Sequence, residues 1–168
     1  MIRITMLIAV IISLQGCIKN EKIETITPTN WSRRTATITD IDSLEYGKSY
    51  LSIYSQMYSE SEHRTYNLTA MVSIRNTSDE DTIYISSTKY FDTNGELVKA
   101  YHDDAIFLAP MQTIEIVIEE QDITGGTGSN FLFEWYIPDG CPEPLFEGIM
   151  NSIIARGMSF ETTAKRIK

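Results

Sequence analysis

The chain has 168 residues, of which 42% are apolar and 22% charged, and its 23 Asp and Glu against 14 Lys and Arg give a formal net charge of -9. This length and composition suit one globular domain with a real hydrophobic core. The acidic balance, with no basic cluster larger than a pair, argues against a nucleic-acid partner. Two Cys and two His are too few for a zinc site unless carboxylates complete it, so neither a metal nor another cofactor is expected.

The first residues have the pattern of an export signal. Residues 1–3 give a short positive start, and residues 4–14 form an apolar run whose only polar members are one Thr and one Ser. As a helix this run would rise only about 16 Å, which is too short for a hydrocarbon core of about 30 Å. It matches the apolar region of a signal peptide over residues 1–16.

Leu14-Gln15-Gly16-Cys17 resembles the bacterial lipobox, in which a Leu and a small residue before an invariant Cys guide lipidation and cleavage. The resemblance implies cleavage between Gly16 and Cys17 and a diacylglyceryl group on Cys17, although Gln15 departs from the usual Ala, Ser or Thr. The membrane is then a partner through this N-terminal lipid. The expected location is the bacterial cell envelope, on the periplasmic face or the cell surface. A plain secretory signal and an uncleaved N-terminal anchor are the alternatives.

The rest of the chain divides at about residue 46. Residues 17–46 are polar and rich in Thr and show no persistent period, which predicts a flexible tether. From residue 47 onward, apolar and polar residues alternate in short runs separated by turn residues, so residues 47–168 are predicted to form the folded domain.

Alternation is clearest in residues 66–75, where Leu68, Ala70, Val72 and Ile74 share one face. The predicted strands are 50–58, 66–75, 82–91, 97–101, 113–119, 131–136, 146–154 and a short run near 158–160.

About eight strands at intervals near ten residues predict an all-β fold, an antiparallel immunoglobulin-like β-sandwich. Asn94-Gly95 between two runs predicts a hairpin turn. The segment 145–155 is also compatible with a helix.

A glycine-rich loop is the most unusual stretch of the domain. It lacks the Gly-Lys-Ser/Thr ending and the following helix that a phosphate-binding loop needs. It either joins two strands through positive φ or binds a ligand or partner. Its carboxylates could offer oxygens to calcium, but the specific Asp spacing of a calcium loop is absent. The candidate residues are Asp122, Gly125, Gly126, Gly128, Ser129 and Asn130.

No motif for catalysis is present, and no catalytic residue is assigned. His102 precedes two Asp, but no nucleophile elbow accompanies it, so we expect a solvated turn histidine. Cys141 lies in a turn-like Asp-Gly-Cys-Pro stretch and is expected to be structural or incidental.

Several segments together resemble a family of small bacterial exported proteins and lipoproteins catalogued as domain of unknown function 3124. The similarity covers residues 48–166, and the segment from the glycine-rich loop to Trp135 is its most specific part. The resemblance implies an envelope location and a single β-rich domain with the loop as its hallmark, and it brings no activity or substrate. The residues that carry it are Asn67-Leu68-Thr69, Ser73-Ile74-Arg75-Asn76-Thr77, Tyr90-Phe91-Asp92, Gly95-x-Leu97-Val98, Gly125–Phe131, Glu134-Trp135, Glu143-Pro144 and Gly157-Met158-Ser159-Phe160.

Two functional hypotheses follow. The first is a lipid-anchored, non-enzymatic module that binds another envelope protein or component. The alternative is a small-ligand or glycan-binding protein, or a hydrolase that uses carboxylates brought together by folding.

Overall fold

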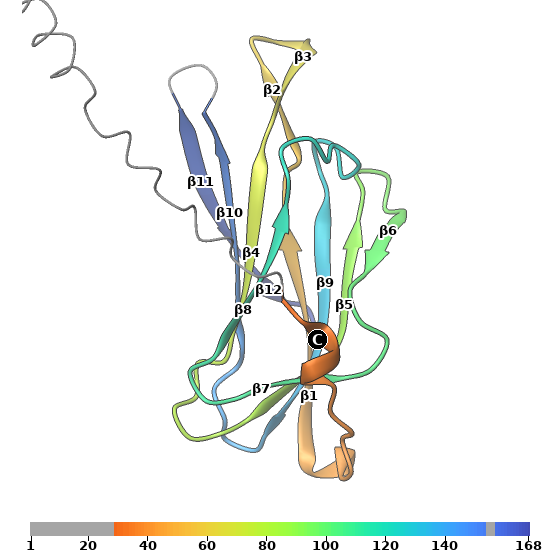
Figure 1. The fold of residues 1–168 in the computed structure, drawn as a ribbon, viewed down its shortest axis with the longest axis vertical. Helices are drawn as coiled ribbons and strands as arrows, with labels where there is room; N and C mark the ends of the chain where they lie inside the picture. Colours follow the sequence, from red (N-terminus) through yellow and green to blue (C-terminus); the bar gives the residue numbers. More distant parts are fainter. Residues whose placement is uncertain (1–28, 154–156) are drawn as a thin grey trace, which may run out of the picture.

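A computed structural model describes residues 29–153 and 157–168 (Figure 1). The predicted signal peptide and the lipidation site Cys17 lie outside this range. Within it, no helix has the length and apolar character needed to cross a bilayer.

The described residues form two short 3₁₀ helices and twelve β-strands. The helices are η1 (Trp31–Arg34) and η2 (Ile41–Ser43). The strands are β1 (Leu44–Ser52), β2 (Gln56–Ser59), β3 (Ser61–Asn67), β4 (Thr69–Arg75), β5 (Ile83–Phe91), β6 (Leu97–Ala100), β7 (Ile106–Leu108), β8 (Thr113–Ile118), β9 (Asn130–Pro138), β10 (Leu145–Ser152), β11 (Met158–Thr163) and β12 (Lys165–Arg166).

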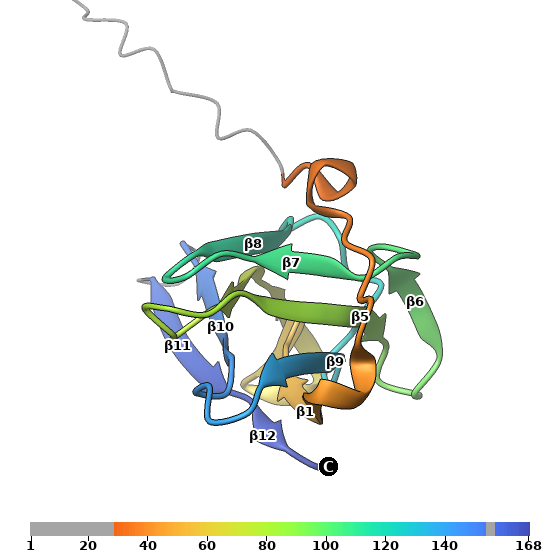
Figure 2. The same ribbon diagram turned by 90° about the horizontal axis from the view of Figure 1, so that it is seen from below.

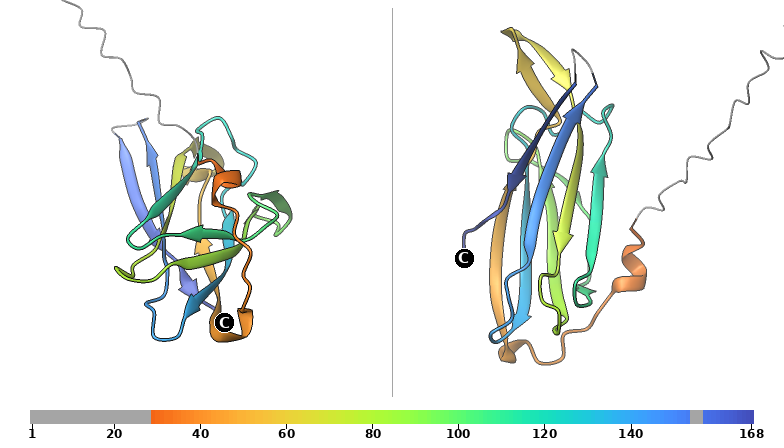
Figure 3. Two further views of the ribbon diagram at one scale, coloured as in Figure 1. Left: turned by 60° about the horizontal axis from the view of Figure 1, so that its bottom comes forward. Right: turned by 90° about the vertical axis from the view of Figure 1, so that its left-hand side faces the viewer.

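The strands build an antiparallel β-sandwich, which confirms the predicted all-β fold. A six-stranded sheet has the order β12-β1-β9-β5-β6, with β7 also paired to β5, and a four-stranded sheet has the order β11-β10-β4-β8. The two sheets face each other as two layers (Figure 2). The β2–β3 hairpin projects from one end of the sandwich, close to the ends of β10 and β11 (Figure 3).

The core lies between the two sheets and follows the alternation of the sequence. Leu68, Ala70, Val72 and Ile74 are fully buried, as the period of two predicts. Aromatic residues of β9 fill the opposite side, and the ring of Phe133 stacks at 4.2 Å on Phe146 of the other sheet. Contacts between aromatic rings therefore join the two layers.

The structure has more strands than the sequence predicts, because several are too short to show a period. β7 and β12 have only three and two residues. The predicted run 50–58 is interrupted after Ser52, where the chain leaves the larger sheet through the β2–β3 hairpin. The segment 145–155, which was also compatible with a helix, forms strand β10 through Ser152.

Residues between Thr29 and Ala36 contact the sandwich, although they fall in the range assigned to the tether. The indole of Trp31 packs at 5.8 Å from the ring of Tyr101. The Ala36 N–H donates to the Ala105 carbonyl at 2.7 Å, and Thr35 forms a β-bridge with Ile106. The chain thus reaches β1 after running along one open side of the sandwich (Figure 2).

Candidate functional site

The glycine-rich loop joins β8 to β9, and Asp122 caps its first turn. The Asp122 carboxylate accepts hydrogen bonds from the N–H and the hydroxyl of Thr124, at 3.1 and 2.5 Å. The Asp122 N–H in turn donates to the Glu119 carbonyl. The candidate carboxylate is therefore exposed but already engaged in ordering its own loop.

Gly125 and Ser129 form the buried base of the loop. The Ser129 hydroxyl donates to the Ile53 carbonyl at 2.8 Å, and the Tyr90 hydroxyl contacts Ser55 Oγ at 2.9 Å and Ser129 Oγ at 3.3 Å. A Cβ atom on Gly125 would lie only 1.8 Å from the Tyr90 hydroxyl oxygen. Gly125 is thus required by close packing on this buried hydroxyl network.

The other two glycines of the loop pack against Thr93 in the β5–β6 turn. Thr93 Oγ1 donates to the Gly125 carbonyl at 3.0 Å and accepts from the Gly128 N–H at 2.9 Å. Gly126 has a φ of +70°, and its carbonyl accepts two N–H groups at the start of β2. Asn130 begins β9, where it lies between β1 and β5. These contacts fix the loop on the end of the sandwich.

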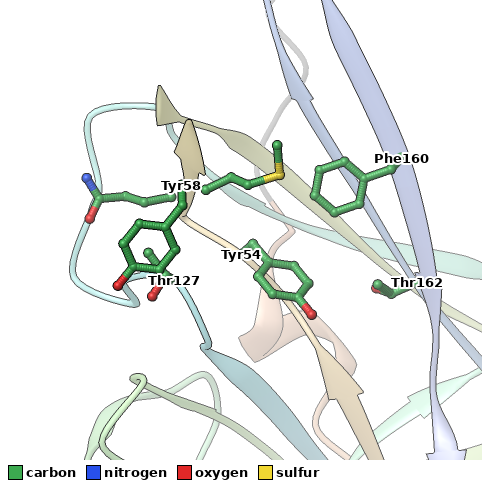
Figure 4. Close-up of a pocket in the computed structure, with 7 residues that line it drawn as sticks. Tyr54, Tyr58, Thr127, Phe160 and Thr162 are labelled. Atoms are coloured by element: carbon green, nitrogen blue, oxygen red, sulfur yellow. The ribbon is translucent and has the colours of Figure 1, made fainter. Parts of the chain in front are cut away.

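Thr127 at the tip of this loop lines a pocket of about 350 Å³ between β2 and β11 (Figure 4). The rings of Tyr54 and Phe160 meet there at 5.9 Å, and Tyr58 is 57% exposed at the rim. Among the residues that the structure describes, no charged side chain lines this pocket. Its lining residues are Tyr54, Gln56, Met57, Tyr58, Thr127, Phe160 and Thr162.

Two of the polar lining groups already have partners in the protein. Thr162 Oγ1 donates to the Ser52 carbonyl at 2.7 Å, and the Gln56 side-chain amide donates to Thr65 and Asn67. The aromatic rings and the Met57 thioether therefore supply most of the contact surface. The pocket is suited to an uncharged, largely apolar group.

The sequence predicted the glycine-rich loop that contains Thr127 as a candidate site, but it did not predict the pocket. Its aromatic rings belong to Tyr54 and Tyr58, which follow β1, and to Phe160 of β11. These two segments meet only in the folded chain. The one local signal is the loss of alternation after Ile53, where Tyr54, Met57 and Tyr58 no longer share a single face.

His102 is not the solvated turn residue that the sequence predicts. Its ring stacks on Trp31 at 5.5 Å, and its two nitrogens bond to the Asp104 carbonyl and to Thr88 Oγ1 at 2.8 and 3.0 Å. Burial lowers the pKa of His102, which favours the neutral ring. The histidine therefore helps to hold the N-terminal segment on the sandwich.

Cys141 is a free and buried thiol. Burial raises its pKa, so the reactive thiolate form is disfavoured, as expected for a structural cysteine. In the residues that the structure describes, no group of three or more His, Cys, Asp or Glu side chains is gathered as a metal site would require.

The fold and the pocket define a small antiparallel β-sandwich protein with an apolar recess at one end. The chain belongs to the family described as Protein of unknown function (DUF3124), whose family model matches residues 46–167. No curated protein matches the sequence. A solved structure titled "Crystal Structure of Thermotoga maritima 1070" is similar, with a TM-score of 0.44 and 11% identity, over 71% of this chain and 92% of that chain.

Proposed function

We propose that the protein is a lipid-anchored, non-enzymatic binding module of the bacterial cell envelope. Its binding site is the pocket between β2 and β11, and its ligand is an aromatic or aliphatic side chain of another envelope protein. The observation that carries this proposal is a pocket lining of three aromatic rings and a Met, with no charged group among the described residues that form it.

The size and the surroundings of the pocket support a protein partner. A volume of about 350 Å³ accepts a group of side-chain size. Tyr58 extends the apolar surface beyond the recess at its rim, and Ile153, directly after β10, is also 87% exposed. Exposed aromatic residues around a small recess are typical of the anchor points of protein interfaces.

A neutral sugar ring is the second candidate ligand. Carbohydrates stack on aromatic rings and bond to hydroxyl groups, and the pocket has both Tyr58 and Thr127 at its opening. None of the described residues that line the pocket is a carboxylate, so this lining gives no support to the hydrolase alternative.

The anchor is tested by Cys17→Ser. The variant is expected to lose labelling by radioactive palmitate and to leave the membrane fraction, because two or more acyl chains are needed for durable attachment. Cys141→Ser is the matched control, since it removes the buried thiol and should keep both the label and the membrane location. Palmitate labelling that survives in Cys17→Ser would overturn the anchor.

The pocket is tested by crosslinking in living cells from a photoreactive residue at position 127. One dominant protein adduct is expected, and Tyr58→Ala should reduce its yield about tenfold or more, because loss of an aromatic anchor costs roughly 2 kcal/mol. A photoreactive residue at exposed Leu97 on β6 is the control position and should not give this adduct.

Each other outcome of the crosslinking experiment has a definite meaning. Glycan adducts at position 127 would mean that the ligand of the pocket is a sugar and not a protein side chain. A protein adduct that is equally strong from Leu97, or that is unchanged by Tyr58→Ala, would remove the pocket as the binding site.

A further inference from the structure

The outer edge of β8 carries backbone groups that point away from its sheet. β8 ends the four-stranded sheet, and among the described strands it pairs only with β4. The Gln112 carbonyl accepts the Asn76 N–H on the β4 side, whereas the Glu115 carbonyl accepts the Thr29 hydroxyl at 2.8 Å. Because successive residues of a strand face opposite sides, the N–H and C=O groups of Thr113, Glu115 and Val117 point outward.

Most of these outward groups have no hydrogen-bond partner among residues 29–153 and 157–168. Within the described part of the chain, only the Glu115 carbonyl has a partner, the Thr29 hydroxyl. The other outward N–H and C=O groups of Thr113, Glu115 and Val117 form no hydrogen bond there. The Val117 side chain is 60% exposed. Such an edge is a template for one more strand.

A groove of about 840 Å³ runs along this edge and gives an added strand room. Residues 113–117 of β8 and Glu119 just after it line the groove, and the lining away from β8 includes Trp31, Arg34, Lys99 and Tyr101. Figure 2 shows β8 at the rim of the sandwich with η1 beside it. The groove is thus bounded by a strand edge on one side and by aromatic residues on the other.

The chemistry of the two sides of the groove differs. Glu115 and Glu119 are exposed on the outward side, and neither forms an ion pair with another described residue. On the inward side the Lys99 ammonium lies 4.6 Å from the centre of the Tyr101 ring, next to Trp31. An added strand would therefore place alternate side chains beside two carboxylates and against two aromatic rings.

A second copy of the chain fits this edge poorly. A two-fold β8–β8 pairing centred on the outward groups would set Glu115 opposite the same residue of the other copy, and like charges directly opposite are destabilising. A different chain with the complementary charge avoids this repulsion.

We propose that the β8 edge accepts an extended segment of a partner protein as an additional strand, with apolar residues facing Trp31 and Tyr101 and basic residues beside Glu115 and Glu119. This is strand addition, in which main-chain hydrogen bonds give affinity and alternate side chains give specificity. The site is separate from the pocket between β2 and β11.

A synthetic octapeptide of alternating Val and Lys tests the proposal on the full chain in detergent. By titration calorimetry it is expected to bind at least tenfold more tightly than a peptide of the same composition with the Val and Lys residues grouped in two blocks. Two N-methylated versions of the peptide distinguish its two edges. Methylation of the alternate amides that face β8 should abolish binding, whereas methylation of the other alternate amides should have little effect, because those amides point away from the β8 edge.

Two variants of the edge and one control variant ensure that the test does not depend on a single protein that might misfold. Glu115→Lys should reverse the preference toward an alternating Val-Glu peptide, whereas Glu96→Lys, the same charge change in the β5–β6 turn, should not. Val117→Pro removes an outward N–H without touching the β4 ladder and should weaken binding about tenfold.

Three results would overturn the proposal. They are equal binding of the alternating and grouped peptides, equal effects of the two methylated sets, and equal effects of Glu115→Lys and Glu96→Lys. Concentration-dependent dimers that disappear in Val117→Pro would assign the edge to a second copy instead.

Discussion

Replacing Phe133 by Ala is expected to lower the free energy of unfolding by about 3–5 kcal/mol. Phe133 is fully buried in β9, and its ring stacks on Phe146 of the opposite sheet at 4.2 Å and lies 5.7 Å from Phe131. The substitution opens a cavity between the two layers, which rigid strands can close only in part. Denaturant titration of the variant and the native protein gives the difference.

Leu132→Ala is the matched control for this prediction. Leu132 precedes Phe133 in β9 but points to the other face and is only half-buried. Its truncation should cost much less, since fewer contacts are lost. Equal losses from the two variants would mean that the rings between the sheets do not dominate the stability of the sandwich.

Gly125→Ala is expected to cost about 1–3 kcal/mol of stability, the usual penalty for overpacking. The new methyl group would overlap the Tyr90 hydroxyl, which must then give up its contacts with Ser55 and Ser129. Thermal or denaturant unfolding measures the loss.

A double-mutant cycle with Tyr90→Phe tests the cause. Tyr90→Phe alone should destabilise by roughly 1 kcal/mol, because it removes a partner of two buried hydroxyls. Without that hydroxyl, part of the Gly125→Ala penalty should vanish. The double variant should therefore lose less stability than the sum of the losses in the two single variants. Strict additivity would show that the glycine is not required by its contact with Tyr90.

The features that sequence predicted well are those decided by neighbouring residues. The alternation in residues 66–75 and the turn at Asn94-Gly95, where Gly95 has a φ of +82°, depend on local geometry alone. The all-β fold class follows from many such local signals.

What could not be predicted depends on residues far apart in the chain. The glycines of the loop are needed because Tyr90 and Thr93 pack on them, and the sequence alone left open whether the loop was structural or a binding loop. The pocket joins Tyr54 and Tyr58 to Phe160 across the two hairpins. Trp31 holds its polar segment on the sandwich through contacts with residues about seventy positions later, so no local period marks it.

The position of β1 has a consequence for the order of folding. Both neighbours of β1, the strands β9 and β12, come from the last third of the chain, and the Trp135–Ser49 hydrogen bond spans 86 residues. Contacts of such long separation must close large loops and form slowly. The larger sheet cannot be completed before the residues of β12 are present, so truncation just before Lys165 would leave β1 without one of its two neighbours.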